Sequence, residues 1–352
     1  MASYIAEFCR ERGIETWKQE VFPDRPNVIA RIDGEQPGKR IVFEAHTDTV
    51  TAADMHNPFD PIISDGRLYG RGACDTKGGL AAMVRALAQV KASDRKPPCE
   101  ILVAATVDEE HSCGGVEALC KSLEADAAIV AEPTLLHLTT ACKGCLRWRI
   151  VVHGREAHSS KPLLGTNAIV HMAEVIRVID QDAQLLNSRS HPLLGSPTCN
   201  MGILRGGTQV NVVPDHCTIE IDRRLLPGEE AGDVLNQYAT LLDDLRSALP
   251  TLDYSMDPPT VLAPPMETPT SIPLVQRAAE ILREMRLESE PVGVPFSCDA
   301  ATLSQCGVPC VVFGPGSIDQ AHMPEEFVEC SQVEQAVDFY QQMMMSDLAE
   351  RH

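Results

Sequence analysis

The feature that most constrains the fold is a predicted buried strand that ends in acidic residues. Residues 101–107 form an apolar run, and Asp108, Glu109 and Glu110 follow it directly. Such a run is typical of a parallel strand that is covered on both faces. Ligands of open α/β folds bind at the carboxyl ends of these strands, so we expect the carboxylates at a functional edge. The alternative is an acidic cap on the helix that is predicted to begin near Gly114.

Other metal-binding side chains also stand at predicted strand ends or in loops. They are His46 at the end of strand 40–46, Asp75 in the glycine-rich loop 70–79, Glu132 after strand 127–131, and His322 beyond strand 309–313. Asp48 follows His46 by two residues, so its carboxylate could orient the imidazole of a metal-binding histidine. Parallel strands end at the same edge of a sheet, and we expect these side chains to gather there.

The length and the pattern of apolar residues predict two domains. A chain of 352 residues exceeds one comfortable hydrophobic core. Near residues 147–153 the apolar residues begin to alternate, which indicates strands with one solvated face. From there to about residue 257 the predicted order is β-α-β-β-α-β, a ferredoxin-like α+β unit. We therefore predict an α/β domain with a mixed, mostly parallel sheet at 1–145 and 258–352, its last helix at 332–350, and an insertion at 146–257.

The composition limits the partners and the compartment. A formal net charge of -20 disfavours nucleic acids and anionic membrane surfaces, because both require a basic face. The 13 cysteines are scattered through apolar runs, as expected for reduced thiols. The N-terminal residues resemble no signal peptide, and no apolar run has the length of a membrane-spanning helix. We expect a cytoplasmic protein.

The predicted edge of the sheet carries a donor set that suits metal ions. Two imidazoles and three carboxylates favour zinc, or a similar first-row ion such as cobalt or manganese. If Asp75 bridges two ions, the first is also bound by His46 and Glu132, and the second by Glu110 and His322. Each ion then has three protein ligands and an open position for a shared water. Glu109 is left beside that water as a general base and later a general acid.

Five ordered motifs resemble the co-catalytic zinc peptidases and deacylases, which include aminoacylase, acetylornithine deacetylase, succinyl-diaminopimelate desuccinylase and glutamate carboxypeptidase. The motifs are His46-Thr-Asp48, Gly72-Ala-Cys-Asp75-Thr-Lys-Gly-Gly79, Asp108-Glu-Glu110, Glu132-Pro-Thr134 and Gly314-Pro-Gly-Ser-Ile-Asp-Gln-Ala-His322. The resemblance implies a zinc-peptidase-like catalytic domain with the five ligands named above, Glu109 as the base and Asp48 as the partner of His46. It also implies a cis peptide bond between Asp75 and Thr76.

The inserted segment resembles the lid domain of the same family. Gly154-Arg-Glu-Ala-His158 resembles the motif whose histidine reaches the active site of a dimer partner and stabilises an oxyanion. Two other segments resemble those that bind the substrate carboxylate, here through Asn211 and Arg224. Arg223 is interpreted as a charge at the rim of the site. The resemblance therefore implies a homodimer that forms through the lid.

The motifs look most like those of the acetylornithine deacetylase branch. We expect a metal-dependent amidohydrolase that removes a small acyl group from an N-acyl amino acid. A desuccinylase, or an aminopeptidase or carboxypeptidase acting on peptides, is an alternative within the family. Two alternatives belong to other classes: a catalytically inactive scaffold protein, and a cysteine hydrolase that uses Cys74 or Cys113.

Overall fold

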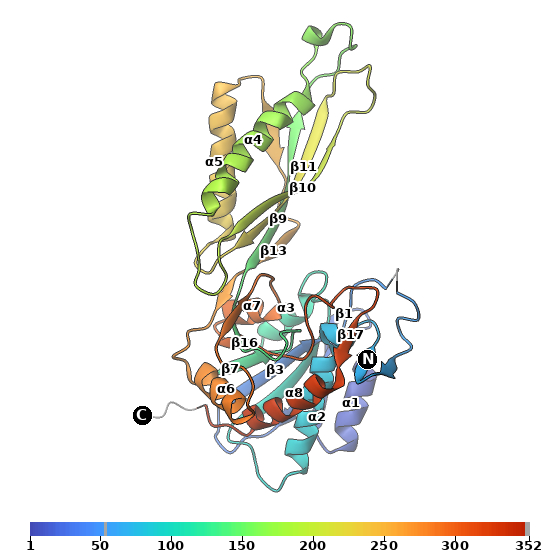
Figure 1. Cartoon of the computed structure of the whole chain (residues 1–352), viewed down its shortest axis with the longest axis vertical. Coiled ribbons are helices and arrows are strands. Elements are labelled where there is room, and N and C mark those ends of the chain that lie inside the picture. Colours follow the sequence, from blue (N-terminus) through green and yellow to red (C-terminus); the bar gives the residue numbers. More distant parts are fainter. Residues whose placement is uncertain (53–54, 349–352) are drawn as a thin grey trace. The chain divides into compact units, whose positions relative to one another are not determined.

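The structure is a computed structural model that describes residues 1–52 and 55–348 (Figure 1). The chain forms two compact units. Unit 1 comprises Met1–Ala141, Glu267–Gly293 and the chain from Cys298 onward, and unit 2 comprises Cys142–Met266 and Val294–Ser297. Unit 2 therefore interrupts the sequence of unit 1. None of the helices in the described part of the chain is long and apolar enough to cross a membrane.

Unit 1 is built on a mixed sheet that has nine strands within the described residues, in the order β1-β2-β6-β3-β7-β16-β8-β14, with β15 beside β8. The strands are β1 (Glu15–Phe22), β2 (Arg25–Ile32), β3 (Arg40–His46), β6 (Glu100–Thr106), β7 (Ala127–Val130), β8 (Thr139–Cys142), β14 (Met266–Glu267), β15 (Val292–Val294) and β16 (Cys310–Val312). The four central strands β6, β3, β7 and β16 are parallel, and their carboxyl ends meet at one edge. The α/β fold with a mixed sheet is the one that the sequence predicts.

Helices cover both faces of this sheet, which explains why its central strands are apolar throughout. The core on one face contains residues of α1 (Ala2–Glu11), α2 (Gly78–Ala92), α6 (Pro273–Glu284) and α8 (Cys330–Met344). The short helices α3 (Gly114–Cys120) and α7 (Asp299–Gln305) contact the sheet and each other. The last helix ends at Met344, earlier than predicted, and residues 349 and 350 of that prediction lie outside the described part. A small separate sheet joins β17 (Phe327–Glu329), β5 (Arg67–Tyr69) and β4 (Ile62–Ser64).

Unit 2 has the predicted β-α-β-β-α-β order. Its elements are β9 (Gly144–His153), α4 (Ala168–Leu186), β10 (Thr198–Gly206), β11 (His216–Leu225), α5 (Ala231–Ala248) and β12 (Asp253–Met256), with β13 (Val261–Ala263) added beside β9. The sheet order β10-β11-β9-β12 is ferredoxin-like. Apolar residues of α4 and α5 form a core with β9 and β11, while β10 lies at the edge of the sheet.

Candidate active site

The predicted metal-binding side chains meet at the carboxyl edge of the four parallel strands of unit 1. His46 is the last residue of β3, and Glu110 and Glu132 follow β6 and β7. His322 lies in the loop after β16. Gly314 is required in this loop, because a Cβ atom there would stand 2.6 Å from the carbonyl oxygen of Glu132. The topology of the sheet thus brings together residues that are distant in the sequence.

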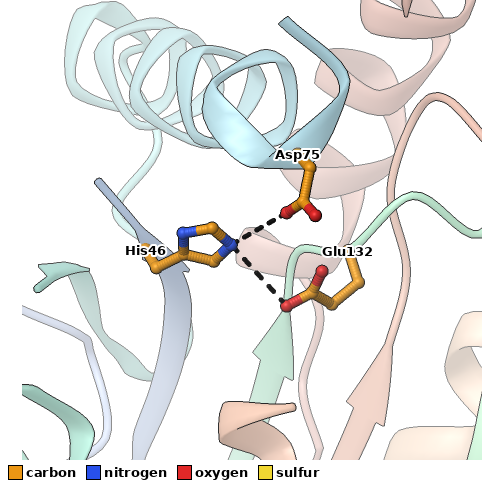
Figure 2. Close-up of side chains that lie close together, drawn as sticks. All are labelled: His46, Asp75 and Glu132. Carbon is orange, nitrogen blue, oxygen red and sulfur yellow. Dashed lines mark hydrogen bonds and ion pairs between the residues drawn. The ribbon is translucent and has the colours of Figure 1, made fainter. Parts of the chain in front are cut away.

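Asp75 lies between two groups of these side chains. Its Oδ1 atom is 3.0 Å from His46 Nε2, and that nitrogen is 4.0 Å from Glu132 Oε1 (Figure 2). The Oδ2 atom of Asp75 is 3.1 Å from His322 Nε2, which is 3.2 Å from Glu110 Oε1. The potential ligand atoms within each group all lie within 4.8 Å of one another. Each oxygen of Asp75 therefore serves a different group, which is the arrangement needed to bridge two ions.

Asp75 is held by a buried glutamate that no sequence pattern indicated. The carboxylate of Glu326 accepts hydrogen bonds from the backbone N–H groups of Gly72, Cys74 and Asp75 at 2.9 to 3.1 Å. It also pairs with the guanidinium of Arg71 at 2.7 Å, and the side chain of Glu326 is only 1% exposed. The backbone of the loop that carries Asp75 is therefore held in place by hydrogen bonds to the Glu326 carboxylate. The peptide bond between Asp75 and Thr76 is cis, as predicted.

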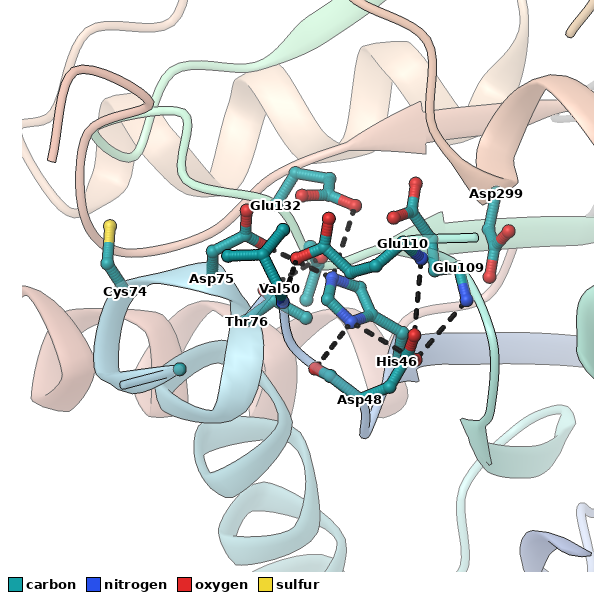
Figure 3. A network of polar contacts seen from close by, with 12 residues as sticks. His46, Asp48, Val50, Cys74, Asp75, Thr76, Glu109, Glu110, Glu132 and Asp299 are labelled. Carbon is teal, nitrogen blue, oxygen red and sulfur yellow. Dashed lines mark hydrogen bonds and ion pairs between the residues drawn. The ribbon is translucent and has the colours of Figure 1, made fainter. Parts of the chain in front are cut away.

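Asp48 connects the histidine of one group to the acidic loop after β6. Its backbone oxygen lies 3.2 Å from His46 Nδ1, and its carboxylate is 3.7 Å from the same atom. The carboxylate also accepts hydrogen bonds from the backbone N–H groups of Asp108, Glu109 and Glu110 at 2.8 to 3.2 Å. Figure 3 shows Asp48 with Glu109 and Glu110. Asp48 thus fixes the loop that presents both glutamates, in addition to contacting the imidazole.

The contacts between histidines and carboxylates shift the pKa values of both. Burial would lower the pKa of His46, but the hydrogen bond to Asp75 and the charge of Glu109 outweigh it and raise the pKa to about 9. Hydrogen bonds to Asp75 and Glu110 raise the pKa of His322 to about 10. Burial would raise the pKa of Asp75, but its hydrogen bonds with the two histidines lower it below its usual range. Without metal, each imidazolium supplies the positive charge that a cation would bring.

Glu109 lies at the same edge but belongs to neither of these two groups. Burial raises the pKa of its carboxyl to about 8, opposed by the positive charge of His46 and assisted by the negative charge of Glu110. Burial and the charge of Asp75 likewise raise the pKa of Glu132. A carboxyl whose pKa lies near neutral pH can both accept and return a proton, which suits general acid and base chemistry.

Two more buried acids lie next to Thr106, the last residue of β6, and neither was predicted as a functional residue. Glu44, on β3, accepts a hydrogen bond of 2.5 Å from Thr106, and Thr106 also contacts Asp299 at 3.4 Å. Glu44 and Asp299 are 0% and 1% exposed. A sequence signal existed for Glu44, because it precedes His46 by two residues and so shares its face of the strand. Asp299 is the first residue of α7, and it lies near Thr106 because α7 packs against the sheet, which no sequence pattern indicated.

Of the two cysteines considered as nucleophiles, Cys74 is buried and Cys113 is half-buried. Burial raises the pKa of Cys74 to about 12, and the thiol donates a hydrogen bond to the carbonyl oxygen of Ser317 at 3.3 Å. Burial and the charge of Asp299 also raise the pKa of Cys113. Because the thiolate is the nucleophile, these shifts oppose cysteine hydrolase chemistry at either residue.

The predicted lid residues all belong to unit 2, but the structure brings only His158 and Asn211 together, whereas Arg224 lies at the other end of β11. The N–H of Ser159, next to His158, donates a hydrogen bond of 3.0 Å to the carbonyl oxygen of Asn211. The side chains of both His158 and Asn211 are exposed. Arg224 lies on β11, where its guanidinium pairs with Asp222 at 2.8 Å.

The interpretation of Arg223 as a rim charge was wrong. Its side chain is 1% exposed and pairs with Glu229 at 2.8 Å. Strand β11 alternates in exposure, so Arg223 points to the same side as the core residues Ile219, Ile221 and Leu225. The alternation was visible in the sequence, but the charge of the residue favoured an exposed position.

The donor set of the two groups around Asp75 fits metal ions. Imidazole nitrogens and carboxylate oxygens are ligands of zinc and of neighbouring first-row ions. Burial, together with the charges of neighbouring carboxylates, raises the pKa values of Glu109 and Glu132, so the site has an excess of acidic groups whose negative charge cations would balance.

Comparison with known proteins identifies the family. Residues 42–346 match the family described as peptidase family M20/M25/M40. The chain is 33% identical over 345 residues to the acetylornithine deacetylase of Photorhabdus laumondii. The aligned region covers 94% of this chain and 86% of the relative. The chain belongs to peptidase family M20/M25/M40. This confirms the predicted family, and the chain is accordingly a hydrolase that acts on amide bonds.

Solved structures of M20 proteins share the fold. The aminopeptidase PepT of Bacillus cereus superposes with a TM-score of 0.82 at 21% identity, over 97% of this chain and 91% of that chain. The YXEP protein of Bacillus subtilis, described as a dinuclear metal-binding peptidase of the M20 family, has a TM-score of 0.74 at 16% identity, over 98% and 90% of the two chains. The M20 family thus includes proteins that bind two metal ions.

Proposed function

We propose that this M20 hydrolase removes a small acyl group from an N-acyl amino acid, with N-acetyl-ornithine as the first candidate substrate. The observation that carries the proposal is the sharing of Asp75 between two ligand groups, with Glu109 left outside both. The substrate class is supported by the relative named acetylornithine deacetylase, which aligns with 94% of the chain.

Two zinc ions, or cobalt or manganese in their place, are the proposed cofactors. His46 and Glu132 would hold one ion, Glu110 and His322 the other, and Asp75 both. When bound, the ions supply positive charge that polarises the amide carbonyl and lowers the pKa of water. The ions would also lower the pKa of Glu109 below its metal-free value of about 8, because nearby positive charge favours the carboxylate.

Glu109 is the proposed carrier of the proton during hydrolysis. Its carboxylate accepts a proton from the attacking water, whose oxygen forms a bond to the carbonyl carbon. The same carboxyl then donates that proton to the amide nitrogen as the C–N bond breaks, which yields a free amine and a carboxylic acid that ionises at neutral pH. Asp48 supports this role, because its carboxylate holds the backbone N–H of Glu109 at 3.2 Å.

His158, Asn211 and Arg224 are the proposed contributions of unit 2. His158 would donate a hydrogen bond to the carbonyl oxygen as negative charge develops on it. Asn211 and Arg224 would bind the carboxylate of the substrate, and Arg224 would exchange its present partner Asp222 for that carboxylate.

A homodimer formed through unit 2 is part of this proposal. Its support is a set of exposed apolar side chains on the edge strand β10, on α4 and in the loops of unit 2: Leu163, Leu164, Ile169, Val170, Ile203, Leu204 and Val210. An unpaired edge strand with apolar side chains is suited to association with another copy. In such a dimer His158 would serve the active site of the partner.

The proposal is tested by measuring amine release from N-acetyl-ornithine, N-acetyl-methionine, N-succinyl-diaminopimelate and a dipeptide. Each substrate is assayed with and without a chelator, and with zinc or cobalt added back. Hydrolysis of an acetylated substrate that the chelator abolishes and the metal restores would support the proposal. Hydrolysis of the dipeptide alone would make the chain a peptidase, and no hydrolysis by protein that holds two ions would refute the deacylase.

A further inference from the structure

A pair of thiols lies where two packed helices of unit 1 end. Cys120 is the last residue of α3, and Cys306 directly follows α7. The two helices contact each other and lie side by side in Figure 1. A hydrogen bond joins the side chains of Cys120 and Cys306, and both cysteines are free thiols. We propose that Cys120 and Cys306 form a reversible disulfide bond when the protein meets a peroxide.

The surroundings of the two thiols give each a different role. Cys306 is exposed, so an oxidant in solution reaches its sulfur directly, whereas Cys120 is half-buried. Burial and the hydrogen bond to Cys306 raise the pKa of Cys120, so this thiol keeps its proton at neutral pH. Susceptibility to peroxide follows exposure and thiolate character. Cys306 is therefore the thiol that reacts with the oxidant, and Cys120 is the thiol that reacts with the oxidised Cys306.

The disulfide forms in two steps, with hydrogen peroxide as the oxidant. The thiolate of Cys306 attacks one peroxide oxygen and the O–O bond breaks, which gives a sulfenic acid and a hydroxide that takes up the proton of the Cys306 thiol. The sulfur of Cys120 then attacks the sulfur of Cys306. As the S–S bond forms, the S–O bond breaks, and the departing hydroxide takes up the proton of Cys120. Two thiols are thus oxidised to one disulfide, and one peroxide is reduced to two water molecules.

The disulfide joins segments that are distant in the sequence. All of unit 2 lies between Cys120 and Cys306 along the chain, so the bond closes a long loop. Closing a long loop restricts the unfolded chain and thereby stabilises the folded protein. Because the thiols already contact each other, the bond requires little movement of α3 and α7. Oxidised protein should therefore unfold at a higher urea concentration than reduced protein, and it should form on the order of minutes to hours.

The test treats the full-length protein with hydrogen peroxide and then blocks the remaining thiols with iodoacetamide. Proteolytic digestion without reductant, followed by mass spectrometry, identifies which cysteines are joined. The variants are Cys306→Ser, Cys120→Ser and, as a control, Cys330→Ser, because Cys330 is a half-buried thiol on a different helix, α8. Circular dichroism verifies that each variant is folded, and a non-reducing gel distinguishes a bond within one chain from a bond between chains.

We expect a peptide that joins Cys120 to Cys306 in the unsubstituted protein and in Cys330→Ser, and its loss after treatment with dithiothreitol. Both other variants should lack it, and oxidation should not raise their urea midpoint. Oxidation of Cys306 without a bond to Cys120, a bond between two chains, or a bond that forms only after urea has unfolded the protein would overturn the proposal. These measurements do not depend on catalysis, so a failure of the proposed deacylase activity would leave them readable.

Discussion

Replacing Glu326 with glutamine should loosen the loop that carries Asp75. Glutamine keeps the size of the side chain but removes its charge, and its NH₂ group would face hydrogen-bond donors. The buried guanidinium of Arg71, whose side chain is 4% exposed, would then lack its carboxylate partner. Breaking a buried ion pair by removing one partner costs about 3–5 kcal/mol of the free energy of unfolding.

A matched control stands three residues further along the chain. Glu329 pairs with Arg67 at 2.7 Å, the same distance as between Glu326 and Arg71, but these side chains are 35% and 44% exposed. An exposed pair of this kind contributes only about 0–1 kcal/mol, so Glu329→Gln should have little effect. The two substitutions therefore change the same chemical group at the same distance from an arginine, and they differ in burial and in the backbone hydrogen bonds that Glu326 accepts.

Urea unfolding measures how much unfolding free energy the Glu326→Gln and Glu329→Gln variants lose. The tryptophans divide between the units, Trp17 in unit 1 and Trp148 in unit 2, so a Trp148→Phe background leaves Trp17 fluorescence as a reporter of unit 1. Competition with a chelator measures metal binding, and we expect the affinity of the Glu326→Gln variant to fall by about 10- to 100-fold, as for other residues that orient metal ligands. Equal losses of stability for Glu326→Gln and Glu329→Gln would refute this reasoning.

Three further predictions concern the catalytic groups and the dimer. Glu109→Gln should lower turnover by about 10²- to 10⁴-fold while the protein still binds two metal ions, and loss of metal in this variant would show that Glu109 is a ligand. Loading metal-free protein with two zinc ions at pH 7 should release at least about two protons. The pKa values of His46 and His322 are about 9 and about 10, so both imidazoles are protonated at pH 7, and each must lose its proton to bind a metal ion. Calorimetry in buffers of different ionisation enthalpy measures this release, which should decrease as the pH rises through the two pKa values; a release that does not depend on pH would contradict the assignment. Leu204→Glu, on the edge strand β10, should convert a dimer to a monomer in size-exclusion chromatography, whereas an unchanged dimer would place the interface elsewhere.

Much of the fold and of the site could be predicted because the relevant signals are local. Apolar runs without alternation identify β3, β6 and β7 as strands covered on both faces, and polar residues after each run mark the carboxyl edge. Parallel strands bring their carboxyl ends together whatever their spacing in the chain, so the residue pattern by itself assigns His46 and Glu132 to the same edge of the sheet. The alternation after residue 147 likewise revealed the second unit.

Tertiary structure decided what depends on packing between distant segments. Only the structure shows that each oxygen of Asp75 faces a different histidine, and that Glu326, 251 residues away, accepts a hydrogen bond from the backbone N–H of Asp75. The sequence could not show this, because Glu326 lies in no periodic pattern and its partners are backbone N–H groups, which leave no trace in the residue types. Arg223 is the converse case. The alternation that buries it was visible in the sequence, but its ion pair with Glu229, six residues further along, depends on the turn after β11. A sequence determines which side chains reach an edge, whereas their mutual distances depend on how helices and loops pack around it.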